Sequence, residues 1–271
     1  MSDLLIREYG PEDVAEIKSL WREVFHDPEA LIDSFFELLP DMGTALTARL
    51  GGQLAGFACV IVGMELIDGE KRKPVVGYIY STAVDERFRG RGIGGRLVKA
   101  AAEKARDREA SLICVLPEEP SLYGWYSSRL GLDCALFRQR LRVESRAAEP
   151  VMGLSSTEYM LWRENMLRAV PHLHPSSFTL EFARRFFESL GGGLYACGSG
   201  ICAAYMEDGA AIISELISMD QGEIPNIAAS IGAQLGASHA VYFIPAAQGE
   251  PYIAARPGLI PPDAVWNLSF D

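Results

Sequence analysis

The sequence has no run of about 18 consecutive apolar residues, no CxxC pair and relatively few basic side chains. Because a helix that crosses a bilayer needs such an apolar run, none is expected. The 25 Lys and Arg are outnumbered by 36 Asp and Glu, and the net charge of −11 speaks against a broad nucleic-acid surface. An acidic protein attracts cations instead, which fits an amine substrate.

The N-terminal stretch MSDLLIREYG also lacks a basic region followed by an apolar core, so no secretory signal is expected. The five cysteines are odd in number, and Cys59 and Cys114 stand in apolar, strand-like runs, where buried and inert thiols are typical. These features favour a reducing compartment. We expect a cytoplasmic protein that binds neither membrane nor nucleic acid; the sequence leaves its oligomeric state open.

The first half of the chain alternates between strand and helix patterns, which predicts a mixed α/β fold. The expected order is β-α-α-β-β-β-α-β-α-β. Strands are expected at residues 3–9, 44–50, 54–67, 75–84, 111–117 and 134–144, and helices at residues 11–25, after Pro28, at 93–108 and at 120–130.

From about Ala147 the pattern restarts as α-α-β-β-β-α-β. A repeated order of elements predicts a second copy of the same architecture, although the two halves share little sequence. We therefore expect two domains in tandem, residues 1–146 and 150–271, joined by a linker within ESRAAEPVMGLSS.

A glycine-rich stretch, FRGRGIGGRL, follows the strand expected at residues 75–84. Gly90-x-Gly92-x-x-Gly95 has the form of a dinucleotide-binding fingerprint. In that fold, however, the first glycine follows its strand almost directly, whereas DERFR intervenes here. Arginines crowd this loop, while a dinucleotide turn works chiefly through its backbone and helix dipole. A nicotinamide or flavin site is therefore disfavoured, and a glycine-rich turn without a ligand is a further alternative.

The same stretch contains Arg89-x-x-Gly92-x-Gly94. This pattern resembles the Arg/Gln-x-x-Gly-x-Gly/Ala signature of the general-control-related N-acetyltransferase (GNAT) superfamily. The similarity extends to IREYGPEDVAEIKSLWREVF, YIYSTAVDERFRGRGIGGRLV and VLPEEPSLYGWYSSRLGL, and so covers about 140 residues. Glycines that turn successive N–H groups inward, before the positive end of a helix, suit the pyrophosphate of acetyl-CoA.

The resemblance implies direct transfer of acetyl from acetyl-CoA to a primary amine of a small molecule or peptide. It implies that Thr82, Ala83 and Val84 offer backbone groups to the pantetheine arm. It also implies a pyrophosphate cradle, with Arg89 either a ligand or a structural residue; the cradle consists of Gly90, Arg91, Gly92, Ile93, Gly94 and Gly95.

The family's general acid is a Tyr in the helix expected at residues 120–130, and the resemblance makes Tyr126 the candidate. Its spacing departs from the usual one, because Gly131 follows five residues later rather than four. Tyr123, one helical turn earlier, is the alternative. The structural interpretation of both is packing or hydrogen bonding within the core.

The general base is not evident, because the strand Ile113-Cys114-Val115 carries no carboxylate. Glu65 is a candidate, although it also fits a solvated strand end. A water relay involving Ser81 and the terminal carboxylate at Asp271 are the other options. The missing strand glutamate and the shifted Tyr leave one alternative function open, a non-catalytic acyl-CoA-binding regulatory module.

Two further features bear on function. His172 and His174 stand close together, but a metal site needs more ligands than are evident nearby, so a loop is favoured. The second half has no cofactor loop, since SMDQGEIPNIAAS has a lone Gly222 with Asp220 and Glu223 beside it. We therefore expect a degenerate second domain that binds no CoA and helps to wall the substrate cleft.

Overall fold

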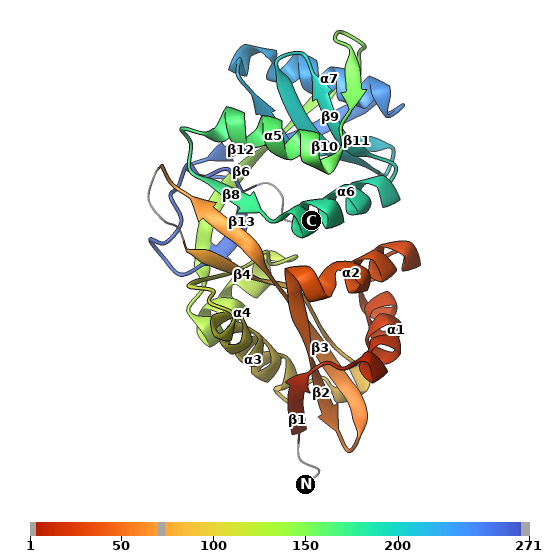
Figure 1. Cartoon of the computed structure of the whole chain (residues 1–271), viewed down its shortest axis with the longest axis vertical. Coiled ribbons are helices and arrows are strands. Elements are labelled where there is room, and N and C mark those ends of the chain that lie inside the picture. The colour runs from red at the N-terminus through yellow and green to blue at the C-terminus, as the bar shows by residue number, and fades with distance from the viewer. Residues whose placement is uncertain (1–3, 70–73, 267–271) are drawn as a thin grey trace. The chain divides into compact units, whose positions relative to one another are not determined.

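The computed structural model describes residues 4–69 and 74–266 and confirms the mixed α/β class. The chain divides into two compact units (Figure 1). Unit 1 comprises Met1–Glu65, Pro74–Ala135 and Ile253–Leu259, and unit 2 comprises Leu66–Lys73, Leu136–Tyr252 and Ile260–Asp271. Neither unit is continuous in sequence, so the division does not follow the single linker expected near residue 147. No helix within the described ranges has the length and apolar character needed to cross a membrane.

Unit 1 follows the pattern read from the sequence, with short 3-10 turns added at two helix starts. Its strands are β1 (Leu4–Glu8), β2 (Gly43–Leu50), β3 (Gln53–Ile67), β4 (Val75–Val84), β5 (Leu112–Val115) and the beginning of β6 (Asp133–Glu144). Its helical elements are η1 (Pro11–Asp13), α1 (Val14–Phe25), α2 (Glu29–Met42), η2 (Glu86–Phe88), α3 (Ile93–Asp107) and α4 (Pro120–Leu130).

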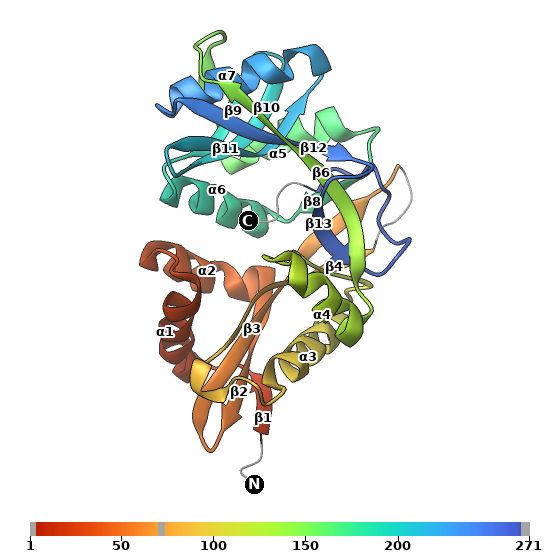
Figure 2. The same cartoon turned by 180° about the vertical axis from the view of Figure 1, so that it is seen from behind.

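The sheet of unit 1 is mixed. Strands β1 to β4 pair antiparallel in chain order, and β4 pairs parallel with β5. The end of β13 (Glu250–Ala255) closes the other edge of β5, with Ala254 opposite Val115. Helices α1 and α2 cover one face of this sheet and α3 and α4 cover the other (Figures 1 and 2).

Apolar side chains of the covering helices are buried against each face of the sheet. Trp21 of α1 and Phe35 of α2 are buried on the first face, where Trp21 stacks on Phe57 at 5.6 Å. Leu97 of α3 packs in the core on the second face. Cys59 and Cys114 are both buried and free, as expected, and burial raises the pKa of each thiol.

The strands of unit 2 follow one another in the sheet in the order β6-β12-β11-β10-β9-β7, with β11 and β12 parallel and the other neighbours in this order antiparallel. Helix α7 packs on one face of it, and Phe186 and Phe187 of α6 contact Tyr205 of β10 on the other (Figure 2). The sequence did not predict β7, β8 or β13. The elements are β7 (Val151–Gly153), α5 (Ser156–Leu167), β8 (His172–Pro175), α6 (Ser177–Ser189), β9 (Gly193–Cys197), β10 (Gly200–Glu207), β11 (Ala210–Ser218), η3 (Gln221–Glu223), α7 (Ile224–Gln234) and β12 (His239–Ala246).

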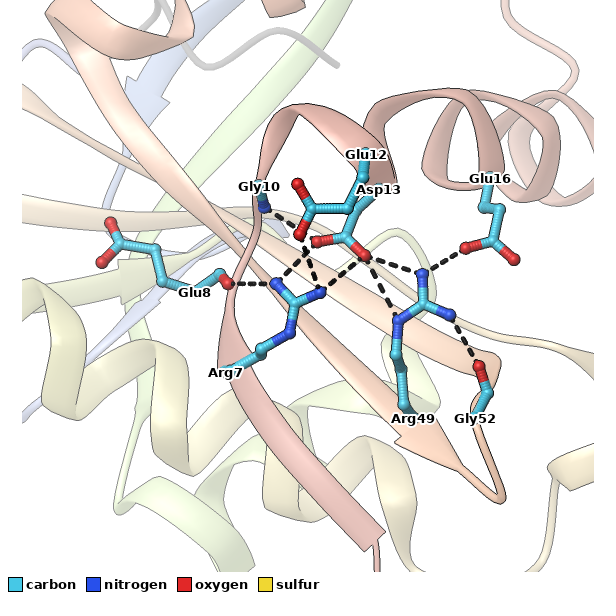
Figure 3. A network of polar contacts seen from close by, with 8 residues as sticks. All are labelled: Arg7, Glu8, Gly10, Glu12, Asp13, Glu16, Arg49 and Gly52. Carbon is cyan, nitrogen blue, oxygen red and sulfur yellow. Dashed lines mark hydrogen bonds and ion pairs between the residues drawn. The ribbon is translucent and has the colours of Figure 1, made fainter.

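A buried carboxylate joins the start of α1 to the sheet of unit 1 (Figure 3). Asp13 has no exposed surface, and it accepts hydrogen bonds from the Gly10 N–H at 2.8 Å and from Arg49 Nη2 at 2.7 Å. Arg7 Nη1 lies 2.7 Å from its second oxygen, and Arg49 also pairs with Glu16. Burial alone would raise the pKa of Asp13, but these hydrogen bonds and charges hold it below its usual value.

We expect Asp13→Asn to lower the free energy of unfolding by about 2–3 kcal/mol, because two guanidinium groups lose their shared charge. The lowered pKa means that the wild-type contribution is complete above the unfolded pKa of about 4 and is lost as the pH falls through the folded value. Urea unfolding between pH 7 and pH 3 measures both effects. Glu12→Gln, which removes an exposed partner of Arg7, is the control and should cost less than about 1 kcal/mol. Equal effects of the two variants at pH 7 would contradict this account.

Candidate functional site

The site begins where strands β4 and β5 separate. Their parallel pairing ends at Ile79 opposite Val115, which is the last residue of β5, while β4 continues to Val84. On its other edge β4 carries a bulge, because Tyr80 and Ser81 lie opposite the single residue Cys59 of β3. A bulge bends a strand and re-aims its backbone groups. Among the described residues, Thr82–Val84 therefore pair with β3 alone, and the opposite edge of β4 is open beyond Ile79.

The loop after β4 is held by its own side chains. Asp85 accepts hydrogen bonds from the Arg87 backbone N–H at 2.9 Å and from Arg87 Nη2 at 2.5 Å, and this contact holds the pKa of Asp85 below its usual value. Arg89 Nε donates to the Val84 carbonyl at 3.1 Å, and Phe88 anchors the loop in the core. Arg89 thus has a structural contact, one of the two alternatives left open by the sequence.

Two glycines give the loop its turn. Gly90 and Gly92 have φ angles of +76° and +73°, in the left-handed region that residues with a Cβ disfavour. A Cβ added at either position would meet no atom within 4 Å. These glycines are therefore needed for their backbone conformation, and the space in front of them is open.

The N-terminus of α3 follows directly and has no side-chain cap. Gly92 is its N-cap, the first turn contains no acidic residue, and the Arg96 N–H makes the first helical bond to Gly92 at 3.2 Å. The N–H groups of Ile93, Gly94 and Gly95 precede that bond and point out of the helix end. By contrast, α5 and α6 are capped by Ser155 and Ser176. An uncapped helix start with positive dipole is suited to an anion.

Helix α4 brings a further guanidinium to this helix start, which the sequence reasoning missed. A Cβ at Gly95 would stand 3.1 Å from Arg129 Nε, and a Cβ at Gly94 would lie 3.7 Å from the Trp125 ring. Arg129 is exposed, stacks over Trp125 at 4.2 Å and donates to the Trp125 carbonyl at 3.1 Å. The available signal was the four-residue spacing of Trp125 and Arg129 on a helix.

The residues expected to hold acetyl-CoA are brought together. Thr82, Ala83 and Val84 lie on the stretch of β4 beyond the end of β5, directly before the glycine loop. Thr82 Oγ1 is buried and has no hydrogen-bond partner among the described residues. An open strand edge, an unsatisfied hydroxyl and an uncapped helix start fit the amide-rich arm and the phosphates of that molecule.

Tyr126 and Tyr123 both lie on α4 against the core shared with α3. Tyr126 is buried, and its ring meets the Trp125 ring edge-on at 4.9 Å. Burial raises the pKa of Tyr126 to about 12, so its hydroxyl keeps its proton at neutral pH. Tyr123 is partly buried beside the same cluster.

Glu65 does not lie near the bulge of β4. It is exposed and lies opposite Val75, the first residue of β4, whereas the bulge begins at Tyr80. Five residues of strand span roughly 17 Å, farther than a glutamate side chain extends. Ser81, the relay candidate, is buried in the bulge, and Asp271 lies outside the described residues.

Other candidate features do not form sites. His172 and His174 lie 3.2 Å and 3.0 Å from the carboxylate of Glu164, and no group of three or more potential metal ligands occurs among residues 4–69 and 74–266. A cavity of about 330 Å³ lies between α1, the β2–β3 turn and η2 and is lined by none of the residues from Gly90 to Gly95. Of its three lining acids, Glu16 and Asp85 already pair with arginines.

The corresponding turn of unit 2, between β11 and α7, is closed by its own carboxylates. Asp220 accepts the Gly222 N–H at 2.8 Å, and Glu223 Oε2 lies 2.5 Å from Ser199 Oγ. Pro225 stands in the first turn of α7 and has no N–H to offer. Asp220 thus occupies the Gly222 N–H and Pro225 removes one donor from the first turn of α7, while the two carboxylates repel a phosphate.

Comparison with protein families gives a match within unit 1. Residues 11–131 match the model of the acetyltransferase (GNAT) family. The match covers less than half of the chain. It runs through the bulged strand, the glycine loop, α3 and α4, so the matched segment contains every contact described above for the open helix start. No curated protein matches the chain.

Solved structures share the fold over nearly the whole chain. A GCN5-related N-acetyltransferase from Kribbella flavida has a TM-score of 0.69 at 15% identity, covering 93% of this chain and 71% of its own. One from Anabaena variabilis has a TM-score of 0.68 at 9% identity, covering 93% and 72%. A conserved protein from Enterococcus faecalis has a TM-score of 0.69 at 14% identity, covering 94% and 72%.

We expect Gly92→Ala to lower the free energy of unfolding by about 1–2 kcal/mol, because the new Cβ has room but the left-handed backbone penalises it. Gly124→Ala, at an exposed helical position with φ outside that region, should leave stability equal or raise it by up to about 1 kcal/mol. Thermal unfolding of both variants measures the difference. A fully stable Gly92→Ala protein would show that the loop does not require the left-handed turn.

Proposed function

We propose that the protein is an acetyl-CoA-dependent N-acetyltransferase whose acceptor is a primary amine of a small molecule or peptide. The observation that carries the proposal is the open N-terminus of α3 behind the left-handed turn at Gly90 and Gly92, within the segment that matches the GNAT family model. Acetyl-CoA supplies the acetyl group as an activated thioester. The acidic net charge of −11 favours an acceptor that arrives as a cation.

Different residues of the loop and its neighbours bind different parts of acetyl-CoA. The N–H groups from Gly90 to Gly95 donate to the pyrophosphate, and the dipole of α3 adds to them. The exposed guanidiniums of Arg91 and Arg129 supply charge-assisted bonds, while Arg89 keeps the loop on Val84. The open edge from Thr82 to Val84 receives the pantetheine amides as an added strand would.

Tyr126 is proposed as the general acid that gives its proton to the departing thiolate. A phenol with a pKa near that of Tyr126, about 12, stays protonated throughout the neutral range and is regenerated readily. The thiolate is the group that needs the proton, and a positioned acid contributes typically 10²–10⁴-fold in rate.

Unit 2 is proposed as a GNAT-like domain that has lost its cofactor loop. The support is the order of its elements and the self-capped turn at Asp220 and Glu223. Two carboxylates at a helix start repel a phosphate, so this unit would bind no CoA.

Stabilisation of the protein against unfolding by added ligand tests which cofactor it binds. We expect acetyl-CoA at a hundredfold excess over its Kd to stabilise the wild-type chain by about 2.7 kcal/mol, and NADH at the same concentration to give no shift. Arg91→Ala should reduce the protection, because a phosphate partner is lost. Arg106→Ala, on the last turn of α3, is the matched control and should keep it. Protection by NADH, or none by acetyl-CoA, would refute the proposal.

Thiol release with a panel of primary amines tests the chemistry. We expect Tyr126→Phe to lower kcat about 100-fold with little change in the KM for acetyl-CoA, because the acid acts after binding. The raised pKa of Tyr126 places the loss of its proton near pH 12, so the wild-type rate should show no decline from this group below pH 10. A larger effect of Tyr123→Phe would transfer the role to Tyr123. Binding of acetyl-CoA without turnover of any amine would indicate the regulatory module instead.

A further inference from the structure

A carboxylate that the reaction scheme has not used lies in the turn between α1 and α2. Helix α1 ends at His26, whose φ of +59° turns the chain, and Asp27 and Pro28 then lead into α2. Asp27 is half-buried, and its Oδ2 accepts a hydrogen bond of 2.7 Å from the indole Nε1 of Trp21. The bond fixes one carboxylate oxygen against α1 and leaves the other for a second partner.

Asp27 stands beside the bulged part of β4. The Trp21 ring that binds it lies 5.9 Å from the ring of Tyr80, and Phe35 lies 5.4 Å from the same ring. Tyr80 is the first residue of the bulge, next to the place where β5 ends. After burial, the charge of Asp27 is the next largest cause of the raised pKa of Tyr80, which places the two groups in electrostatic contact.

The environment of Asp27 differs from that of three other acids in this part of the chain. Asp33 pairs with Lys18, Glu29 with Arg22, and Asp13 with two arginines. No lysine or arginine pairs with Asp27 among the described residues; the groups that interact with it are the Trp21 indole, the His26 imidazole and the Tyr80 phenol. Burial raises the pKa of Asp27, against the opposing effects of Trp21 and His26.

A half-buried carboxylate without a basic partner is unfavourable for stability, and such groups concentrate at functional sites. An arriving ammonium would supply the missing positive charge, and aromatic rings beside the carboxylate favour a cation as well. Strand β5, with the sequence Leu112–Val115, offers no carboxylate for the same task, and Glu65 lies at the far end of β3.

We propose that Asp27 is the proton acceptor for the amine substrate, an inference that rests on the proposed function. The ammonium gives one proton to the free oxygen of Asp27, and the nitrogen lone pair then attacks the thioester carbonyl carbon. A C–N bond forms and the C–S bond breaks, with its electron pair leaving on sulfur. The second nitrogen proton replaces the one that Tyr126 gives to the thiolate, and Asp27 returns its proton to solvent.

The test compares Asp27→Asn with wild type in thiol release, using the amine from a panel of putrescine, tyramine and a lysine-containing tripeptide that wild type acetylates fastest. We expect kcat/KM at pH 7 to fall at least 100-fold. The wild-type rate should fall as the pH drops through the raised pKa of Asp27. In Asp27→Asn the rate should instead rise with pH until the pH approaches the pKa of the free amine. The difference in rate between the variant and wild type should therefore become smaller at high pH. A deficit below threefold, or one that is constant with pH, overturns the proposal.

Two controls separate this inference from alternative explanations. Asn can still accept the indole hydrogen bond and removes a buried charge. The melting temperature of Asp27→Asn should therefore equal or exceed that of wild type. A marked decrease in melting temperature, together with a pH-independent loss of rate, would assign Asp27 a structural role. Asp41→Asn, at an exposed position near the end of α2, should leave the pH profile unchanged. Acetyl-CoA should protect Asp27→Asn as well as wild type. If wild type is neither protected by acetyl-CoA nor active on any probe, the proposed function fails first and the role of Asp27 fails with it.

Discussion

The separation of two parallel strands is the constraint on which the rest of the site depends. Strand β5 ends at Val115 while β4 runs on past Ile79, and the bulge at Tyr80 and Ser81 bends β4 at the same level. Sheet hydrogen bonds that β5 does not make remain available to a ligand, because backbone donors and acceptors in a protein interior must find partners. The open edge of β4 and the glycine loop that follows it are thus parts of one continuous surface.

Charge then distinguishes the two units, which have helices at similar positions after a strand. In unit 1 the first turn of α3 has no acidic residue, Arg129 lies next to Gly95, and Asp85 is already paired with Arg87. In unit 2 the turn before α7 holds Asp220 and Glu223, whose oxygens accept bonds from the chain itself. Carboxylates beside a helix start repel an external anion, whereas a start without acidic residues leaves its N–H groups and its dipole to bind one.

Burial also assigns different chemistry to the two faces of the unit 1 sheet. On the α3 and α4 face, Tyr126 is held protonated by its apolar surroundings. On the α1 and α2 face, Asp27 is a half-buried carboxylate without a basic partner among the described residues, and Trp21, which packs beside Tyr80 of the bulge, donates a hydrogen bond to it. An acid that keeps its proton and a carboxylate whose pKa is raised are the two kinds of group that a proton-transfer reaction requires.

The sequence by itself determined the elements of unit 1 apart from β13, because apolar periodicity is local, and it identified the loop, because Gly90 and Gly92 are required by a backbone conformation that other residues disfavour. It also indicated that the second unit lacks such a loop. Only the tertiary structure decided which chemistry surrounds the loop. Arg129 reaches Gly95 from another helix, Glu65 is separated from the bulge by the register of β3 and β4, and Trp21, which donates to Asp27, packs beside Tyr80. These relations depend on strand register and helix packing between residues distant in the chain, and no local pattern encodes them.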